Sequence, residues 1–297
     1  MRSNLILLLA AMIWGAGFAA QHAAMEGMGP LAFTAIRFLL GWVVLQPIVR
    51  RRKPSISSAS VSFKPVLILG LVLFAGSIFQ QYGLLFTTAS KAGFLTGLYV
   101  VFVPLLGLFL KHRLKRNTWI GTGLAALGLY FLSVTESFHF APGDGLILIG
   151  AVIWAVHVLL LGNLAAKQDP VRLASQQFLI VGVIASVAAL LFETQTPSTW
   201  LSVWPWVAYS GVFAVAVAFT LQAMGQAKAS PAHCAILLSF EAVFAALAGM
   251  ALLGESLSMR EIGGGVLMFI GIIVSQLGGD TDSEPSDLAP EVHPPAS

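Results

Sequence analysis

Long runs of apolar residues, separated by short polar or basic stretches, fill the chain up to about residue 278. Most are close to 20 residues long, the length that an α-helix needs to cross the hydrocarbon core of a bilayer. The runs are residues 4–21, 31–49, 65–88, 90–110, 118–135, 145–163, 172–192, 201–223, 231–252 and 261–278. They are too long and too continuously apolar for the strands of a membrane barrel. The pattern predicts an all-α integral membrane protein with ten transmembrane helices.

The second half of the chain repeats features of the first half. Trp154 follows Trp14, and Ala229-Ser230 follows Ala89-Ser90, each after about 140 residues. Farther on the offset is about 143, and the matching residues are Leu114, Gly121 and Gly128 with Leu257, Gly264 and Gly271. Five helices per half is an odd number, so the second half enters the membrane from the opposite side. We therefore predict two inverted five-helix repeats, residues 1–138 and 139–278, a recurrent plan among secondary transporters.

Basic residues are distributed unevenly between the two sides of this topology. With a cytoplasmic N-terminus, thirteen Lys and Arg residues fall at the cytoplasmic ends and two, Lys91 and Arg260, fall outside. The positive-inside rule then places both termini in the cytoplasm, as in a bacterial inner-membrane protein. The net charge of +3 reflects this topology and indicates no nucleic-acid partner. The basic clusters at 50–53 and 111–116 can contact anionic membrane lipids.

Composition sets further bounds on function. The chain is 57% hydrophobic and 10% charged, which is far too apolar for a soluble domain of this size. A single cysteine excludes an internal disulfide and a zinc site built from cysteines. The six histidines form no metal-binding spacing with carboxylates, so neither a metal nor another cofactor is predicted. Residues 279–297 are acidic and proline-rich, which is typical of a disordered tail, here cytoplasmic.

Four short motifs occur in order along this duplicated chain. They are Met12-Ile13-Trp14-Gly15, Gly29-Pro30, Arg37-Phe38 and Leu253-Gly254-Glu255-Ser256-Leu257. With these motifs the chain resembles the EamA-type transporters of the drug/metabolite transporter superfamily over about residues 4–278. The resemblance implies a ten-helix inverted-repeat carrier with a central cavity that moves amino acids, other metabolites or drugs, often outward.

Two positions depart from the pattern of that family. The ninth helix often carries Glu-Pro in such proteins, whereas this chain has Glu241-Ala242. The first-half counterpart of Gly254-Glu255 is Lys111-His112. The acid at 241 is therefore retained without the kinking proline, and only one of the two helix ends is acidic.

Two tryptophans stand in the middle of apolar runs. Trp14, Phe18 and Gln21 are spaced i, i+4 and i+7, so they share one face of the first helix. Trp154 and His157 share a face of the sixth helix. We expect both faces to line the cavity, because small-molecule sites are apolar pockets with a few convergent polar groups. The alternative is that the tryptophans only fill space between helices and that His157 is a hydrogen-bonded core histidine.

Further polar side chains interrupt the apolar runs: Gln80, Gln81, Tyr99, Gln177 and Gln222. An amide that faces lipid has no partner, so these groups should point inward. A side chain that points inward can contact the substrate or form an interhelical hydrogen bond, and we give these two interpretations equal weight. Gln80 and Gln81 cannot both face the cavity squarely, because neighbours on a helix are about 100° apart.

Arg37 and Glu241 are the ionisable residues deepest in the runs. A charge at that depth is costly unless it is paired or hydrated, which marks both as candidates for gating or coupling. Either they pair with each other between helices two and nine, or Glu241 takes up protons and couples transport to the proton gradient. Pro104 removes a backbone hydrogen bond from the fourth helix and is a candidate hinge.

Together these observations favour a carrier of small organic solutes. No Walker motif is present, so the chain itself does not hydrolyse ATP. An intramembrane enzyme is the rival class, but Glu241 is the single acid deep in the runs and has no second deep acid with which to share acid–base chemistry. Only Arg37 lies deep enough to meet a phosphorylated solute. Amino acids are therefore the first substrate class and lipophilic drugs the second. The glycines at 121, 128, 264 and 271 permit close helix packing, within the chain or in a homodimer.

Overall fold

The computed structural model describes residues 2–52, 63–110, 114–134, 141–194, 197–253 and 258–277. The predicted acidic tail, Lys53, the Lys111-His112 pair and the Gly254-Glu255 motif lie outside these residues. Every regular element in the described ranges is helical. The elements are α1 (Arg2–Ala24), α2 (Pro30–Arg51), α3 (Phe63–Gly83), α4 (Ala89–Gly97), α5 (Tyr99–Phe109), α6 (Arg116–Ser133), α7 (Pro142–Ala165), α8 (Pro170–Phe192), α9 (Pro197–Tyr209), η1 (Ser210–Phe219), α10 (Thr220–Gln226), α11 (Pro231–Leu238), α12 (Glu241–Leu253) and α13 (Met259–Gln276).

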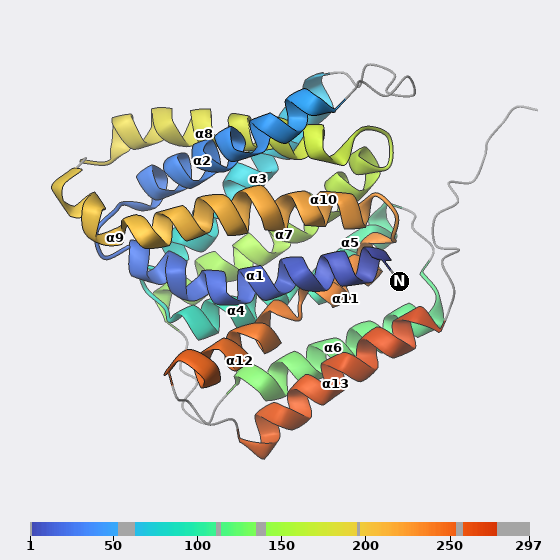
Figure 1. Ribbon diagram of the computed structural model, residues 1–297. Helices are drawn as coiled ribbons and strands as arrows, with labels where there is room; N and C mark the ends of the chain where they lie inside the picture. The colour runs from blue at the N-terminus through green and yellow to red at the C-terminus, as the bar shows by residue number, and fades with distance from the viewer. Residues whose placement is uncertain are drawn as a thin grey trace, which may run out of the picture.

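Helix starts follow proline positions in the sequence. Pro30, Pro142, Pro170 and Pro231 each occupy the first turn of a helix. Proline is favoured there because its missing N–H would have no partner within the helix and its φ angle is already helical. The loops between the apolar runs are therefore short, and consecutive helices run back and forth through the bundle (Figure 1).

Eight helical segments within the described residues are long and apolar enough to cross a membrane. The other two predicted runs form α6, which begins with polar residues, and the interrupted pair α11 and α12. The all-helical membrane architecture is therefore confirmed, whereas the count of ten spanning helices stays a prediction. Large apolar side chains such as Leu190, Phe213 and Phe269 are at least half exposed on the outside of the bundle, the surface that would face lipid.

Contacts between helices of the first half and helices of the second half occur in reciprocal pairs. Helix α3 packs on α7, and α1 packs on the segment formed by α9, η1 and α10. Likewise α1 packs on α12, and α5 packs on α7. Helix α2 also packs on η1, and α3 packs on α8. Two contacts join corresponding helices directly, α2 with α8 and α6 with α13. Helices α6 and α13 lie side by side at one edge of the bundle (Figure 1).

The glycine pairs of α6 and α13 make this contact close. A Cβ atom on Gly128 would lie 2.5 Å from the carbonyl oxygen of Gly264, and one on Gly121 would lie 2.6 Å from that of Gly271. No side chain larger than hydrogen fits at either contact without moving a backbone. The close approach that these glycines permit is therefore used inside the chain.

Two helices break in the middle of the bundle. Helix α4 ends at Gly97 and α5 begins at Tyr99, with Leu98 between them. Helix α11 ends at Leu238 and α12 begins at Glu241. Tyr99 and Glu241 are 142 positions apart, so they occupy corresponding places in the two halves. Pro104 lies buried inside α5, so the interruption precedes the proline that we considered as a hinge.

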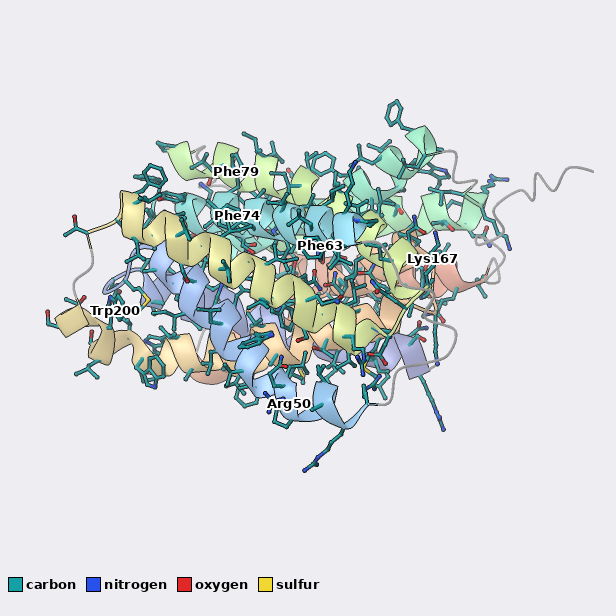
Figure 2. All side chains as sticks on the ribbon, turned by 90° about the horizontal axis from the view of Figure 1, so that it is seen from above. Arg50, Phe63, Phe74, Phe79, Lys167 and Trp200 are labelled. Carbon is teal, nitrogen blue, oxygen red and sulfur yellow. The ribbon has the colours of Figure 1, made fainter. Side chains whose placement is uncertain are left out.

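Charged side chains gather at the ends of the bundle. Figure 2 shows Lys167 and Trp200 toward opposite ends of the bundle and Arg50 at its lower edge. The start of α1 and the end of α13 lie at the same end of the bundle (Figure 1). Ion pairs also join helices at these ends: Arg52 with Asp169, and Lys91 with Asp144.

Candidate functional site

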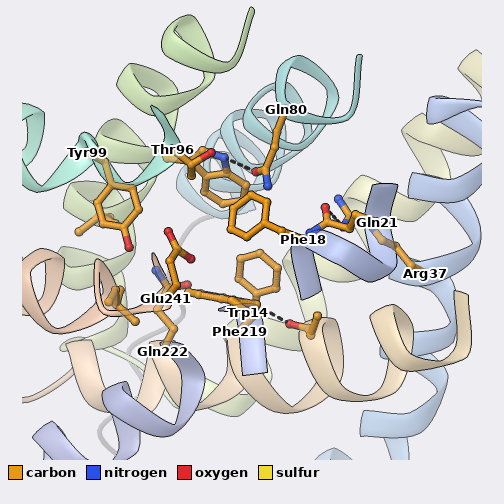
Figure 3. Close-up of a pocket in the computed structure, with 14 residues that line it drawn as sticks. Trp14, Phe18, Gln21, Arg37, Gln80, Thr96, Tyr99, Phe219, Gln222 and Glu241 are labelled. Atoms are coloured by element: carbon orange, nitrogen blue, oxygen red, sulfur yellow. Dashed lines mark hydrogen bonds between the residues drawn. The ribbon is translucent and has the colours of Figure 1, made fainter. Parts of the chain in front are cut away.

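A cavity lies at the centre of the bundle and is lined by residues from both halves of the chain (Figure 3). Nine of the predicted site residues contribute to its wall: Trp14, Phe18, Gln21, Arg37, Gln80, Tyr99, Trp154, Gln222 and Glu241. Its volume is about 50 Å³, which holds a few water molecules and is well below the size of usual ligand pockets, about 300–1,000 Å³. A solute would therefore require the helices around the cavity to separate.

Trp14 forms part of the wall and is held by the second half of the chain. Its indole Nε1 donates a hydrogen bond to the carbonyl oxygen of Ala214 at 3.0 Å. Its ring packs edge-on against Phe219, with 4.8 Å between ring centroids. Both partners belong to η1, a π-helical segment, and such segments are frequent at functional sites. The orientation of Trp14 thus depends on a helix about 200 residues away in the sequence.

Trp154 reaches across to the first half of the chain. Its Nε1 donates to Oε1 of Gln80 at 2.9 Å, and its ring stacks on Phe219 at 5.8 Å. A Cβ on Gly76 of α3 would lie 3.2 Å from the Trp154 indole, so the absence of a side chain there lets α3 and α7 approach. Both tryptophans therefore pack against the ring of Phe219, and the three rings form part of the cavity wall.

Arg37 is buried, with 5% of its surface exposed, and it has local partners. Its Nη1 donates to Oε1 of Gln21 at 2.8 Å. Its guanidinium carbon lies 5.0 Å and 5.2 Å from the ring centroids of Phe33 and Phe38, close enough for cation–π attraction. Among the described residues Arg37 and Glu241 form no ion pair, so the structure does not contain the interhelical pair that we considered for them.

Glu241 lies at the other end of the cavity and is 3% exposed. Figure 3 shows its carboxylate and the Tyr99 hydroxyl facing each other, with Gln222 nearby. Oε1 of Glu241, the Tyr99 hydroxyl, Oε1 of Gln222 and the Thr96 hydroxyl are all buried without a hydrogen-bond partner. Nε of Arg37 is a fifth such atom in the cavity wall. Buried polar groups are normally satisfied, so five unpartnered atoms in one cavity indicate a place where another molecule supplies partners.

The remaining predicted residues lie outside the cavity wall. Nε2 of Gln81 is 3.5 Å from the Gln21 carbonyl oxygen, on a different face of α3 from Gln80. Nε2 of His157 is 2.9 Å from Oε1 of Gln177, so these two side chains are partners between α7 and α8. Pro104 lines no part of the cavity. For these polar residues the structure favours the interhelical reading over direct solute contact.

Five lining residues were not anticipated from the sequence: Thr96, Val158, Ala214, Phe219 and Leu238. Phe219 precedes Gln222 by three positions and so shares its helix face, which is a signal that the sequence contained. The other four are ordinary residues of apolar runs. Nothing in the sequence separates them from their neighbours.

Outside the membrane-spanning segments, Asp169 joins the end of α2 to the start of α8. Its carboxylate accepts hydrogen bonds from the backbone N–H groups of Val171 and Arg172 and pairs with Arg52 at 2.5 Å. Burial acts to raise the pKa of Asp169, but the hydrogen bonds and the charge of Arg52 outweigh it, so the pKa is lowered. Asp169 is therefore ionised at neutral pH and holds these helix ends together.

Glu193 connects the opposite ends of the same two helices. Its two carboxylate oxygens accept hydrogen bonds from the backbone N–H groups of Leu31 and Ala32, at 2.7 Å and 2.9 Å. These N–H groups belong to the first turn of α2 and have no partner within that helix. Helices α2 and α8 are thus joined at both ends.

Sequence comparison matches the EamA-like transporter family twice along the chain, at residues 1–134 and at 141–277. The chain belongs to the EamA-like transporter family. An uncharacterized transporter of Archaeoglobus fulgidus is 30% identical over 276 residues, which cover 93% of this chain and 86% of the relative. The uncharacterized transporter YwfM of Bacillus subtilis is 28% identical, with 91% of this chain and 92% of the relative covered.

A further relative within the EamA family is the uncharacterized inner membrane transporter YedA of Escherichia coli K12. It is 24% identical, with 89% of this chain and 87% of the relative covered. Among solved structures, one crystal structure matches with a TM-score of 0.77 and 22% identity, over 93% of this chain and 96% of that one. This structural likeness shows a shared fold. The family and these relatives indicate a multi-pass membrane transporter.

Proposed function

We propose that this EamA-family chain is a secondary transporter that exposes its central cavity alternately to the two sides of the membrane. The observation that carries the proposal is the cavity itself, whose wall combines aromatic rings and a few polar groups from both halves of the chain. Small-molecule sites have this composition. Because the cavity in this conformation is too small for an organic solute, admission of one requires the surrounding helices to move.

The proposed architecture is a pair of inverted five-helix repeats. Support comes from the two matches to the family, one in each half, and from the reciprocal contacts between the halves. The corresponding breaks at Leu98 and at residues 239–240 give further support. Inverted repeats place the solute near the middle of the membrane, so that related movements of the two halves open either side. With the basic residues inside, both termini are cytoplasmic and the membrane is the inner membrane.

The proposed solutes are small organic metabolites, moved outward, with aromatic amino acids as the first class to test. The cavity wall offers large aromatic surface, and Arg37 is the one buried cation among its lining residues. A multiply charged phosphate ester would require several such cations. The chain contains no ATP-binding motif, so a solute gradient, exchange or an ion gradient drives the movement.

Counterflow of labelled amino acids in proteoliposomes tests this proposal. We expect saturable exchange with the wild-type chain and loss of exchange in the Trp14→Ala and Trp154→Ala variants. The matched control is Trp204→Ala, since Trp204 is 48% exposed and lies outside the cavity. Exchange that survives both cavity substitutions would reject the site, and no exchange by folded wild-type protein would reject this solute class.

A further inference from the structure

The two buried charges of the cavity lie next to different turns of α1. Arg37 binds Gln21, whereas the backbone carbonyl of Glu241 would lie only 2.6 Å from a Cβ on Gly15. Gly15 and Gln21 are six residues apart, which corresponds to about 9 Å along a helix. Figure 3 shows Arg37 on one side of the aromatic residues and Glu241 on the other.

The two charges also differ in how well they are satisfied. Nη1 of Arg37 donates to the side-chain oxygen Oε1 of Gln21, and the guanidinium lies close to two phenyl faces, although Nε of Arg37 is buried without a hydrogen-bond partner. Within the described part of the chain, no Lys or Arg pairs with Glu241, and its Oε1 accepts no hydrogen bond. A carboxylate at this depth needs a partner, because a bare charge in a low-dielectric interior is strongly disfavoured.

The surroundings of Glu241 fit a positively charged nitrogen. Oε1 of Gln222 and the hydroxyl oxygens of Tyr99 and Thr96 are buried in the same cavity without partners, and each can accept a hydrogen bond. An ammonium group donates up to three hydrogen bonds and accepts none, so it complements a group of unused acceptors. The adjoining rings of Trp14 and Phe219 add faces that attract cations.

We propose that Glu241 binds the ammonium group of the solute and that the preferred solute is an organic amine with an aromatic body and no carboxylate. This inference rests on the proposed transport function, and it places carboxylate-free aromatic amines ahead of amino acids as the preferred solutes. An α-amino acid would also have to place its carboxylate at Arg37, whose Nη1 already has the side-chain oxygen of Gln21 as a partner, whereas an amine without a carboxylate leaves that contact intact.

Binding of three phenyl compounds to the purified full-length chain tests the assignment. The probes are phenethylamine, phenylalanine and 3-phenylpropionate, which share the ring and differ in charged groups. Isothermal titration calorimetry in detergent should give the tightest binding for phenethylamine. Glu241→Gln should weaken phenethylamine binding roughly tenfold or more, since a buried charged partner is lost. Glu241→Asp, which keeps the charge, should restore part of the affinity.

Two controls separate the ammonium site from general damage. Glu26→Gln removes the same charge from an exposed position outside the cavity and should leave phenethylamine binding unchanged. Neutral 2-phenylethanol should bind Glu241→Gln as it binds the wild type, which shows that the cavity is intact. Undetectable binding of phenethylamine to the wild type, tighter binding of 3-phenylpropionate, or unchanged phenethylamine affinity in Glu241→Gln would overturn the proposal.

The outcome is distinguishable from that of the transport proposal. Amine binding that depends on Glu241 without counterflow of any solute would support the ammonium site and reject transport of the tested solutes. Counterflow that is equal in wild type and Glu241→Gln would support transport and reject Glu241 as the ammonium ligand.

Discussion

Replacing Gly15 by alanine should displace Glu241, because Gly15 marks the closest approach of α1 to α12. The new Cβ would lie 2.6 Å from the Glu241 carbonyl oxygen and 2.8 Å from the Ala245 nitrogen. Ordinary contacts begin at 3.4 Å, so one backbone must move by 3.4 − 2.6 = 0.8 Å. Both groups are backbone atoms, which cannot turn away as a side chain can. Overpacking of this kind costs about 1–3 kcal/mol.

Gly17→Ala is a matched control on the same helix. Its Cβ would meet nothing closer than 3.9 Å. Both substitutions remove a glycine from a helix interior and gain a similar helix propensity, about 1 kcal/mol. The difference between the two variants therefore isolates the clash.

Thermal unfolding in detergent and solute counterflow measure the two consequences. At about 2 °C per kcal/mol for a chain of this size, Gly15→Ala should melt roughly 2–6 °C below Gly17→Ala. Counterflow should fall in Gly15→Ala and stay near the wild-type rate in Gly17→Ala, because only the first substitution moves the cavity end of α12. Equal melting temperatures and equal rates in the two variants would refute the reasoning.

Three further predictions concern packing and the helix ends. Gly264→Ala should lower the melting temperature, because its Cβ would lie 2.6 Å from backbone atoms of α6, whereas Gly263→Ala, which meets nothing within 4 Å, should not; equal thermal unfolding curves would contradict this. Glu193→Gln should destabilise the chain by about 1–2 kcal/mol in denaturant titrations, since one of the two acceptor oxygens is replaced by an NH2 group that faces a backbone N–H, while exposed Glu26→Gln should have no effect. The lowered pKa of Asp169 stabilises the fold above its ordinary value of 3.8, and this stabilisation is lost as pH falls through the lowered pKa. In the Asp169→Asn variant the melting temperature should therefore fall less as the pH is lowered than it does in the wild type. An equal fall in both proteins would mean that Asp169 adds no stability.

The site was only partly predictable, and Gln80 and Gln81 show why. Helical spacing says that they face about 100° apart, but it does not say which one faces the cavity. The packing of α3 on α7 decides it, since Trp154 takes Gln80 as its hydrogen-bond partner. Likewise, the depth of Arg37 in its run predicted the need for a partner, but only the tertiary structure shows that the partner is Gln21 and not Glu241.

The sequence alone determined the elements that depend on local composition. Apolar runs of membrane-spanning length, prolines at helix starts and the ordered motifs around Trp14 and Arg37 are properties of short segments, so they can be read without the fold. The cavity is different because it is made by segments far apart in the chain. The break before Glu241, the π-helical segment that carries Phe219, and the unpartnered oxygens near Tyr99 all arise from packing between the halves. Their positions depend on which helices become neighbours, and a linear pattern of apolar and polar residues does not contain that information.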